Sequence, residues 1–114
     1  NQTIPEMMPY SVSCAALNQM TRSLSVSLAK DGIRVNAISL GSIMSSSLRL
    51  NLHSNPELQD SIIDATPLGY IAEPAEVADL ALFLSSESAR FLTGQVITID
   101  GGRSILNKLE KAAY

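Results

Sequence analysis

Tyr10 and Cys14 are the side chains whose types and spacing bear most directly on chemistry. They are four residues apart in a segment with helical periodicity, which places both on one helix face, about 6 Å apart along the axis. A phenol has an unperturbed pKa near 10, so proton transfer near neutral pH requires a neighbouring cation. Cys14 is a neutral thiol, and its ionisation would raise the pKa of the phenol. The nearest downstream cation, Arg22, lies roughly 18 Å along the helix and is out of reach.

The other residues that could carry chemistry are few. One cysteine and one histidine exclude an internal disulfide and a Cys/His zinc site. We interpret Cys14 as a small buried apolar side chain in helix packing in preference to a reactive thiol, and His53 as solvent-exposed. Three acidic residues lie at helical spacing, namely Glu57, Asp60 and Asp64. This pattern indicates a solvated helix face and not a metal site. No metal is predicted.

The composition narrows the class of protein. The chain has 114 residues, 46% hydrophobic and 17% charged, which is enough to bury a core. The net charge of −3 gives no basic field for nucleic acid or an anionic membrane. The apolar runs are shorter than the ~20 residues of a membrane span, and no signal-peptide pattern opens the chain. We therefore expect a cytoplasmic protein.

The elements that must position these residues alternate between helix and strand. Residues 1–9 carry two prolines and predict a loop, and residues 10–31 predict a helix ended by Gly32. Residues 33–40 are β-branched and predict a buried strand. The apolar face expected to cover the core recurs every four residues along the helix, at Val12, Ala16, Met20, Leu24 and Leu28.

The second half repeats this order after an irregular stretch. Residues 42–67 mix serines with leucines and predict an excursion with one short helix at 57–65. Residues 73–102 predict the last helix, to about Ser85, and a second buried strand at 95–99. The tail, 103–114, is weakly helical from Ser104.

Two strands joined through a helix are expected to be parallel, and parallel strands require cover on both faces. A doubly wound sheet uses about six strands, and only two are visible here. The sequence therefore predicts an α/β chain that is the C-terminal part of a doubly wound parallel sheet, or one whose missing strands come from a partner.

Five short stretches, in this order and spacing, resemble the short-chain dehydrogenase/reductase family. The resemblance covers Tyr10 to Gly102, nearly the whole chain, and implies a Rossmann-like fold. The stretches are Tyr10-Ser-Val-Ser-Cys14, Gly32-Ile-Arg-Val-Asn-Ala-Ile38, Leu40-Gly41-Ser-Ile43-Met-Ser45, Pro67-Leu-Gly69 with Glu73-Pro-Ala-Glu-Val-Ala78, and Phe91-Leu-Thr-Gly-Gln-Val-Ile97 with Asp100-Gly-Gly102.

The resemblance implies an NAD- or NADP-dependent oxidoreductase acting on a small carbonyl or alcohol substrate. It implies that Tyr10 is the proton carrier and also contacts the cofactor. It further implies that Gly41, Ile43 and Ser45 line the nicotinamide, with the main chain of Ile43 pairing with the carboxamide. The family's lysine position holds Cys14, and Leu40 replaces its proline. The glycine-rich loop and active-site serine are expected to precede Asn1.

Two functions stay open from the sequence. One is an oxidoreductase of this family, working as a homo-oligomer or with a complementing N-terminal half. The other is a truncated, catalytically impaired remnant that serves oligomerisation or interaction. The lid-like excursion carries apolar side chains that either contact an apolar substrate or pack the lid against the core, namely Met44, Leu48, Leu50 and Leu52.

Overall fold

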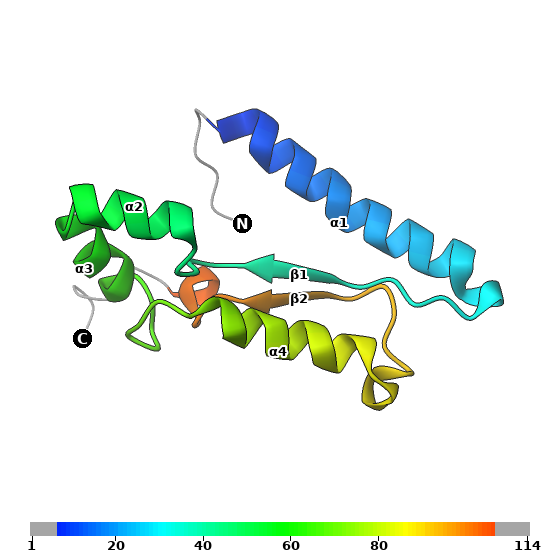
Figure 1. Cartoon of the computed structure of the whole chain (residues 1–114). Coiled ribbons are helices and arrows are strands. Elements are labelled where there is room, and N and C mark those ends of the chain that lie inside the picture. The colour runs from blue at the N-terminus through cyan, green and yellow to red at the C-terminus, as the bar shows by residue number, and fades with distance from the viewer. Residues whose placement is uncertain (1–6, 107–114) are drawn as a thin grey trace, which may run out of the picture. The chain divides into compact units, whose positions relative to one another are not determined.

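The structure is a computed structural model that describes residues 7–106. Along the described residues, a long helix precedes the first strand, and a run of helices separates the first strand from the second (Figure 1). The chain divides into two compact units, the first made of residues up to Ser39 with Ala78–Thr98, and the second of Leu40–Val77 with residues from Ile99 onward. The elements are α1 (Met8–Leu28), η2 (Ala29–Asp31), β1 (Ala37–Leu40), α2 (Ser46–Ser54), α3 (Glu57–Asp64), α4 (Pro74–Ser85), η3 (Glu87–Ala89), β2 (Val96–Ile99) and η4 (Arg103–Ile105).

The strands β1 and β2 pair in parallel. In the first unit Ala37 N–H donates to Gln95 C=O at 2.8 Å, and in the second Gly41 N–H donates to Ile99 C=O at 2.9 Å. The partner residue therefore advances with the strand, as parallel pairing requires. Both predicted strands exist but are shorter than expected, and most of their residues are half-buried. The prediction of full burial was wrong because the described residues supply only a two-stranded sheet.

Helix α1 begins at Met8, two residues before the predicted start. Pro9 stands at its second position, where the backbone N–H has no partner within the helix, so the proline fits there without cost. The loop predicted up to Pro9 was therefore too long, and its first six residues lie outside the described range. At the other end, Gly32 has φ of 71° and closes the helix after the η2 turn, as predicted.

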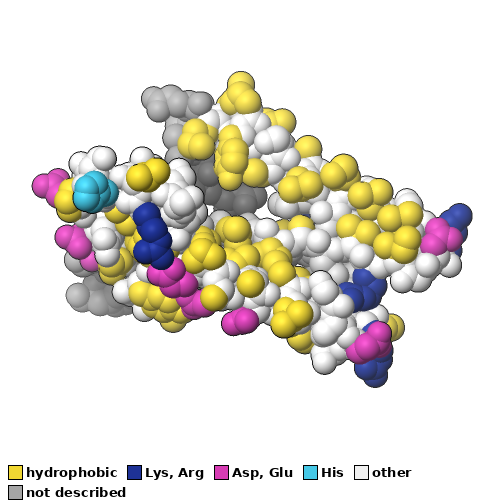
Figure 2. All heavy atoms as spheres, viewed as in Figure 1, with side chains coloured by type: hydrophobic (Ala, Val, Ile, Leu, Met, Phe, Trp, Pro, Cys, Tyr) yellow, Lys and Arg dark blue, Asp and Glu magenta, His cyan; other side chains and the backbone are white. Residues whose placement is uncertain are grey.

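The apolar face of α1 is not covered by the described residues, contrary to the sequence prediction. Val12 is 62% exposed and Met20 is 52% exposed, and Figure 2 shows hydrophobic side chains along the length of this helix. Thr21 and Ser25 are buried instead, and their hydroxyls donate to helix carbonyls at 2.9 and 2.7 Å. These small hydroxyls require no further partner and permit close packing within the first unit.

The predicted excursion folds into a helical hairpin within the second unit. Helix α3 matches the predicted helix at 57–65, whereas α2 was not predicted. Leu52 packs with Ile62 and Ile71 in a small apolar core, with Met44 and Leu48 against it. Met44, Leu48 and Leu52 of the predicted lid therefore pack inward, whereas the side chain of Leu50 is 71% exposed.

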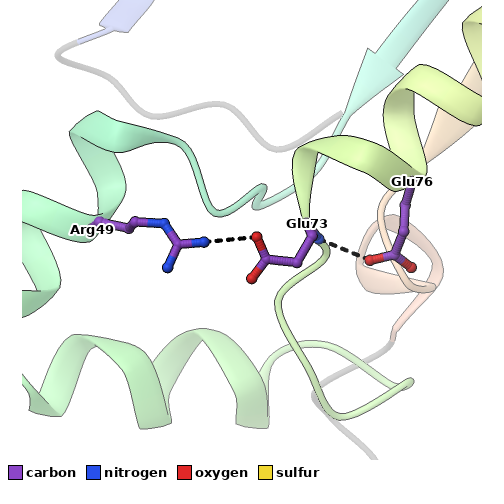
Figure 3. A network of polar contacts seen from close by, with 3 residues as sticks. All are labelled: Arg49, Glu73 and Glu76. Carbon is purple, nitrogen blue, oxygen red and sulfur yellow. Dashed lines mark hydrogen bonds and ion pairs between the residues drawn. The ribbon is translucent and has the colours of Figure 1, made fainter.

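The start of α4 is fixed by a capping arrangement (Figure 3). Glu76 accepts the Glu73 N–H at 2.8 Å, and this bond lowers the pKa of its carboxyl. The Glu73 carboxylate in turn accepts a bond from Arg49 of α2 at 2.7 Å. Both side chains of this ion pair are more than half exposed, so it contributes at most about 1 kcal/mol. Helix α4 ends at Ser85, as predicted.

The remaining predictions concern the tail and membranes. A short η4 turn opens the tail, and the helix expected beyond it falls mainly on residues outside the described range. In the part of the chain that the structure describes, no helix has the length and apolarity to cross a bilayer.

We predict that the 114-residue chain alone is not a stable monomer. Two paired strands leave both outer sheet edges without a strand among residues 7–106, and the apolar face of α1 is exposed. Size-exclusion chromatography with hydrogen exchange measures this directly. A compact monomer with strongly protected amides at 35–38 and 96–99 would contradict the prediction.

Candidate functional site

The predicted site residues fall into two groups. Tyr10 lies on the first turn of α1, in the first unit. Gly41, Ile43 and Ser45 lie on the segment between β1 and α2, in the second unit. We call residues 41–45 the post-β1 loop and describe each group in its own unit.

Tyr10 and Cys14 lie on one face of α1, one turn apart, as predicted. Tyr10 is 63% exposed, and Cys14 is also exposed, so the interpretation of the thiol as a buried packing residue was wrong. The reason is that no described element covers this face of α1. The neighbouring Cys14 side chain raises the pKa of the exposed Tyr10 phenol above its ordinary value of 10.0. The thiol therefore holds the phenol in its protonated form.

The post-β1 loop starts with a close backbone approach at Gly41. Its N–H donates to Ile99 C=O, and a Cβ at this position would lie 2.6 Å from Asp100 Cβ. Real Cβ atoms do not approach so closely, so any larger residue at position 41 would displace the backbone at Gly41 or at Asp100. Glycine at this position lets the loops that follow β1 and β2 lie against each other.

Ile43 carries the backbone groups that could bind a ligand. It centres a parallel bridge with Ala72, in which Met44 N–H donates to Ala72 C=O at 2.8 Å. The bridge thus uses the amide of Met44 and not that of Ile43 itself. Among residues 7–106 the Ile43 N–H has no hydrogen-bond partner. The Ile43 C=O accepts one bond, from Ser45 N–H at 2.7 Å, and keeps a second lone pair. A donor and an acceptor on one residue can pair with a primary amide.

Ser45 has a structural task as the N-cap of α2. Its hydroxyl oxygen accepts the Leu48 N–H at 3.2 Å. The O–H proton is still available for donation, so the side chain can contact a ligand while it caps the helix. Sequence reasoning missed both this cap and α2, although a serine before a leucine-containing segment is a typical helix start.

Three further residues support the loop and were not among the predicted site residues. Arg103 Nη1 donates to the Ser42 hydroxyl at 2.9 Å, and Asp100 orders the turn that carries Arg103. A signal for them existed, because the carboxyl ends of parallel strands meet at one edge of a sheet. The segments after β1 and β2 were therefore bound to be neighbours.

A small depression of about 60 Å³ lies beside the post-β1 loop, within the second unit. Its lining includes Ile43, Tyr70, Glu76 and Asp100. Tyr70 donates to Glu76 at 2.8 Å, and this bond raises the pKa of the phenol. The Tyr70 hydroxyl is therefore already bound to the glutamate that caps α4. Among the described residues no group of three or more His, Cys, Asp or Glu side chains could hold a metal ion.

Comparison with known proteins identifies relatives over most of the chain. A family model described as "Enoyl-(Acyl carrier protein) reductase" matches residues 1–104. The galactitol 2-dehydrogenase of Cereibacter sphaeroides is 38% identical over 96 residues, which are 84% of this chain and 37% of that protein. A tropinone reductase homolog of Arabidopsis thaliana is 41% identical over 84% of this chain and 36% of its own length. The chain thus spans little more than a third of these curated relatives.

Solved structures show the same likeness. A short chain dehydrogenase family protein from Francisella tularensis aligns with a TM-score of 0.81 and 36% identity, over 91% of this chain and 46% of that one. A 4-hydroxyisoleucine dehydrogenase complexed with NADH aligns with a TM-score of 0.79 and 33% identity, over 86% and 40%. The predicted fold class, an incomplete doubly wound Rossmann-like sheet, is confirmed.

Substitution of Gly41 tests the close approach of the two loops. In a fusion protein made of the N-terminal part of the galactitol 2-dehydrogenase, up to its match, followed by the complete 114-residue chain, we expect Gly41→Ala to cost about 1–3 kcal/mol of folding free energy. It should also deprotect the Met44 amide in hydrogen exchange. The control Gly69→Ala has a positive φ but open space, so it should cost about 1 kcal/mol and leave Met44 protected. Unchanged Met44 exchange in Gly41→Ala would contradict the account.

Proposed function

This chain belongs to the short-chain dehydrogenase/reductase family, and we propose that it is part of an NAD(P)-dependent oxidoreductase acting on a small carbonyl or alcohol substrate. The carrying observation is the post-β1 loop, where Ile43 offers an N–H donor and a C=O acceptor from a backbone held on both sides. A bound nicotinamide would supply or accept the hydride.

The chain's own residues have separate tasks in this proposal. The main chain of Ile43 pairs with the carboxamide of the nicotinamide, and the Ser45 hydroxyl donates to the same ligand. Gly41 keeps the loop close to the turn after β2 and so sets the position of Ile43. Tyr10 donates a proton from its hydroxyl to a carbonyl oxygen, or removes one from an alcohol.

Cys14 fits a nicotinamide cofactor less well than the post-β1 loop does. A lysine one turn after the tyrosine lowers the phenol pKa and holds the ribose in the family pattern. The Cys14 thiol raises the phenol pKa and carries no cationic donor. Proton donation from the phenol therefore remains available near neutral pH, whereas proton removal from an alcohol requires a phenolate that is scarce there.

The proposal extends to the parts this chain does not carry. We take residues 1–114 as the C-terminal portion of one Rossmann-type domain, with 10–31 as the active-site helix, 42–67 as the lid and 73–102 as the last helix and strand. A complementing N-terminal half would supply the glycine-rich loop for NAD or NADP, and the assembled protein would work in the cytoplasm. The similarity to a protein complexed with NADH supports a nicotinamide cofactor of either kind.

A second candidate function is that of a catalytically impaired module for oligomerisation. The favouring observation is the exposed apolar surface of the first unit, with Phe91 at 100%, Leu82 at 72% and Phe83 at 44% exposure. Size exclusion of the wild type and of Phe91→Ser separates the candidates. Loss of self-association in the variant, without any dinucleotide binding by the fusion protein, favours the module.

The fusion protein also tests the role of Tyr10. We expect Cys14→Lys to raise the rate of alcohol oxidation by about tenfold to a hundredfold, because an ammonium replaces a thiol that raises the phenol pKa. The ascending limb of the pH profile should move to lower pH, since a lower pKa gives the phenolate at lower pH. Steady-state rates between pH 6 and pH 10.5 measure both effects.

The matched control is Asn18→Lys, which adds the same charge on the same helix face about 12 Å from Tyr10 along the axis. It should leave both the rate and the pH profile unchanged. Equal behaviour of the two lysine variants would mean that Tyr10 is not the proton carrier.

A further inference from the structure

The post-β1 loop is tied through a side chain to the turn that follows β2. Arg103 Nη1 donates to Ser42 Oγ at 2.9 Å, and both residues are half-buried. Ser42 directly precedes Ile43, so this bond acts on the peptide unit whose N–H belongs to Ile43. The contact therefore bears on the orientation of the ligand-binding amide.

The position of Arg103 is itself fixed by Asp100. The two carboxylate oxygens of Asp100 accept the Gly102 N–H at 2.9 Å and the Ser104 N–H at 2.8 Å. The Arg103 N–H donates to the Asp100 C=O at 3.2 Å, so the backbone on both sides of Arg103 is held. The ordered turn therefore fixes the backbone from which the Arg103 side chain reaches Ser42.

Ile43 is thus held from two directions. On its C-terminal side, Met44 N–H donates to Ala72 C=O. On its N-terminal side, Arg103 donates a hydrogen bond to Ser42. Within residues 7–106, this is the only hydrogen bond that a side chain of another segment makes to the post-β1 loop. The 68–72 segment is also bound to the β2 turn, since Leu68 N–H donates to Gly101 C=O at 3.1 Å.

We propose that Arg103 is a positioning residue for the nicotinamide end of the cofactor, acting through Ser42 to orient the Ile43 amide. The inference rests on the proposed function, because it assigns Ile43 to the carboxamide. Arg103 does not touch the reacting atoms in this role. Its effect is confined to the order of the loop and therefore to cofactor affinity.

The test uses Arg103→Ala, Ser42→Ala and the double variant in the fusion protein. Each single variant should weaken dinucleotide binding about fivefold, which is the size of one half-buried hydrogen bond, and raise KM for the dinucleotide with a smaller change in kcat. The double variant should bind no worse than either single one, because both remove the same bond. Arg103→Lys should restore part of the affinity.

A second readout needs no cofactor. Hydrogen exchange of the Gly41 and Met44 amides should accelerate in Arg103→Ala and in Ser42→Ala, since these two hydrogen-bonded amides lie on either side of Ser42 and Ile43 within the loop. The control Arg90→Ala removes the same charge from an exposed side chain whose bond stays within its own turn, and it should change neither exchange nor affinity.

The outcomes separate the two hypotheses. If the wild-type fusion protein binds dinucleotide and both single variants bind equally well, the positioning role of Arg103 is overturned and the proposed function stands. Additive losses in the double variant would also overturn it. If the wild type binds no dinucleotide, the proposed function fails, and the exchange of Gly41 and Met44 still decides whether Arg103 orders the loop.

Discussion

The parallel pairing of β1 with β2 is the constraint on which the candidate site depends. Parallel strands end at the same edge of a sheet, so the segments that follow them are neighbours although they are about sixty residues apart. Gly41 permits the close approach of these segments, with Asp100 in direct contact. The capped turn after Asp100 then carries Arg103 to Ser42. Two short strands thus fix the backbone of the loop that presents Ile43.

The same pairing explains what the chain leaves incomplete. A parallel sheet is stable when both faces are covered and its edges are paired, and two strands with a partly exposed helix do not provide this. The apolar face of α1 is not covered by residues 7–106, and the chain spans little more than a third of its curated relatives. The post-β1 loop is held by hydrogen bonds on both sides of Ile43, while Tyr10, the proposed proton carrier, lies beside Cys14, which raises the pKa of its phenol.

Much of the fold follows from local patterns, and the errors have physical causes. The structure contains the elements that three local patterns predicted. These patterns are Gly32 after a periodic helix, the helix from Pro74 to Ser85, and the β-branched runs at both strands. The failed predictions concern burial, as with Val12 and Cys14, because local periodicity identifies an apolar face and not the element that covers it. The Arg103–Ser42 contact depends on strand pairing over long range, so residue spacing alone does not reveal it.

In the proposed site, the Ile43 amide is the donor that binds the cofactor. The most direct measurement is amide NMR of the isotopically labelled fusion protein during titration with NAD(H) and, separately, NADP(H). The account predicts that the Ile43 amide resonance shifts downfield with saturation, because a free N–H gains an acceptor, and that its hydrogen exchange slows. Saturable dinucleotide binding that leaves the Ile43 amide unshifted and freely exchanging would contradict the account.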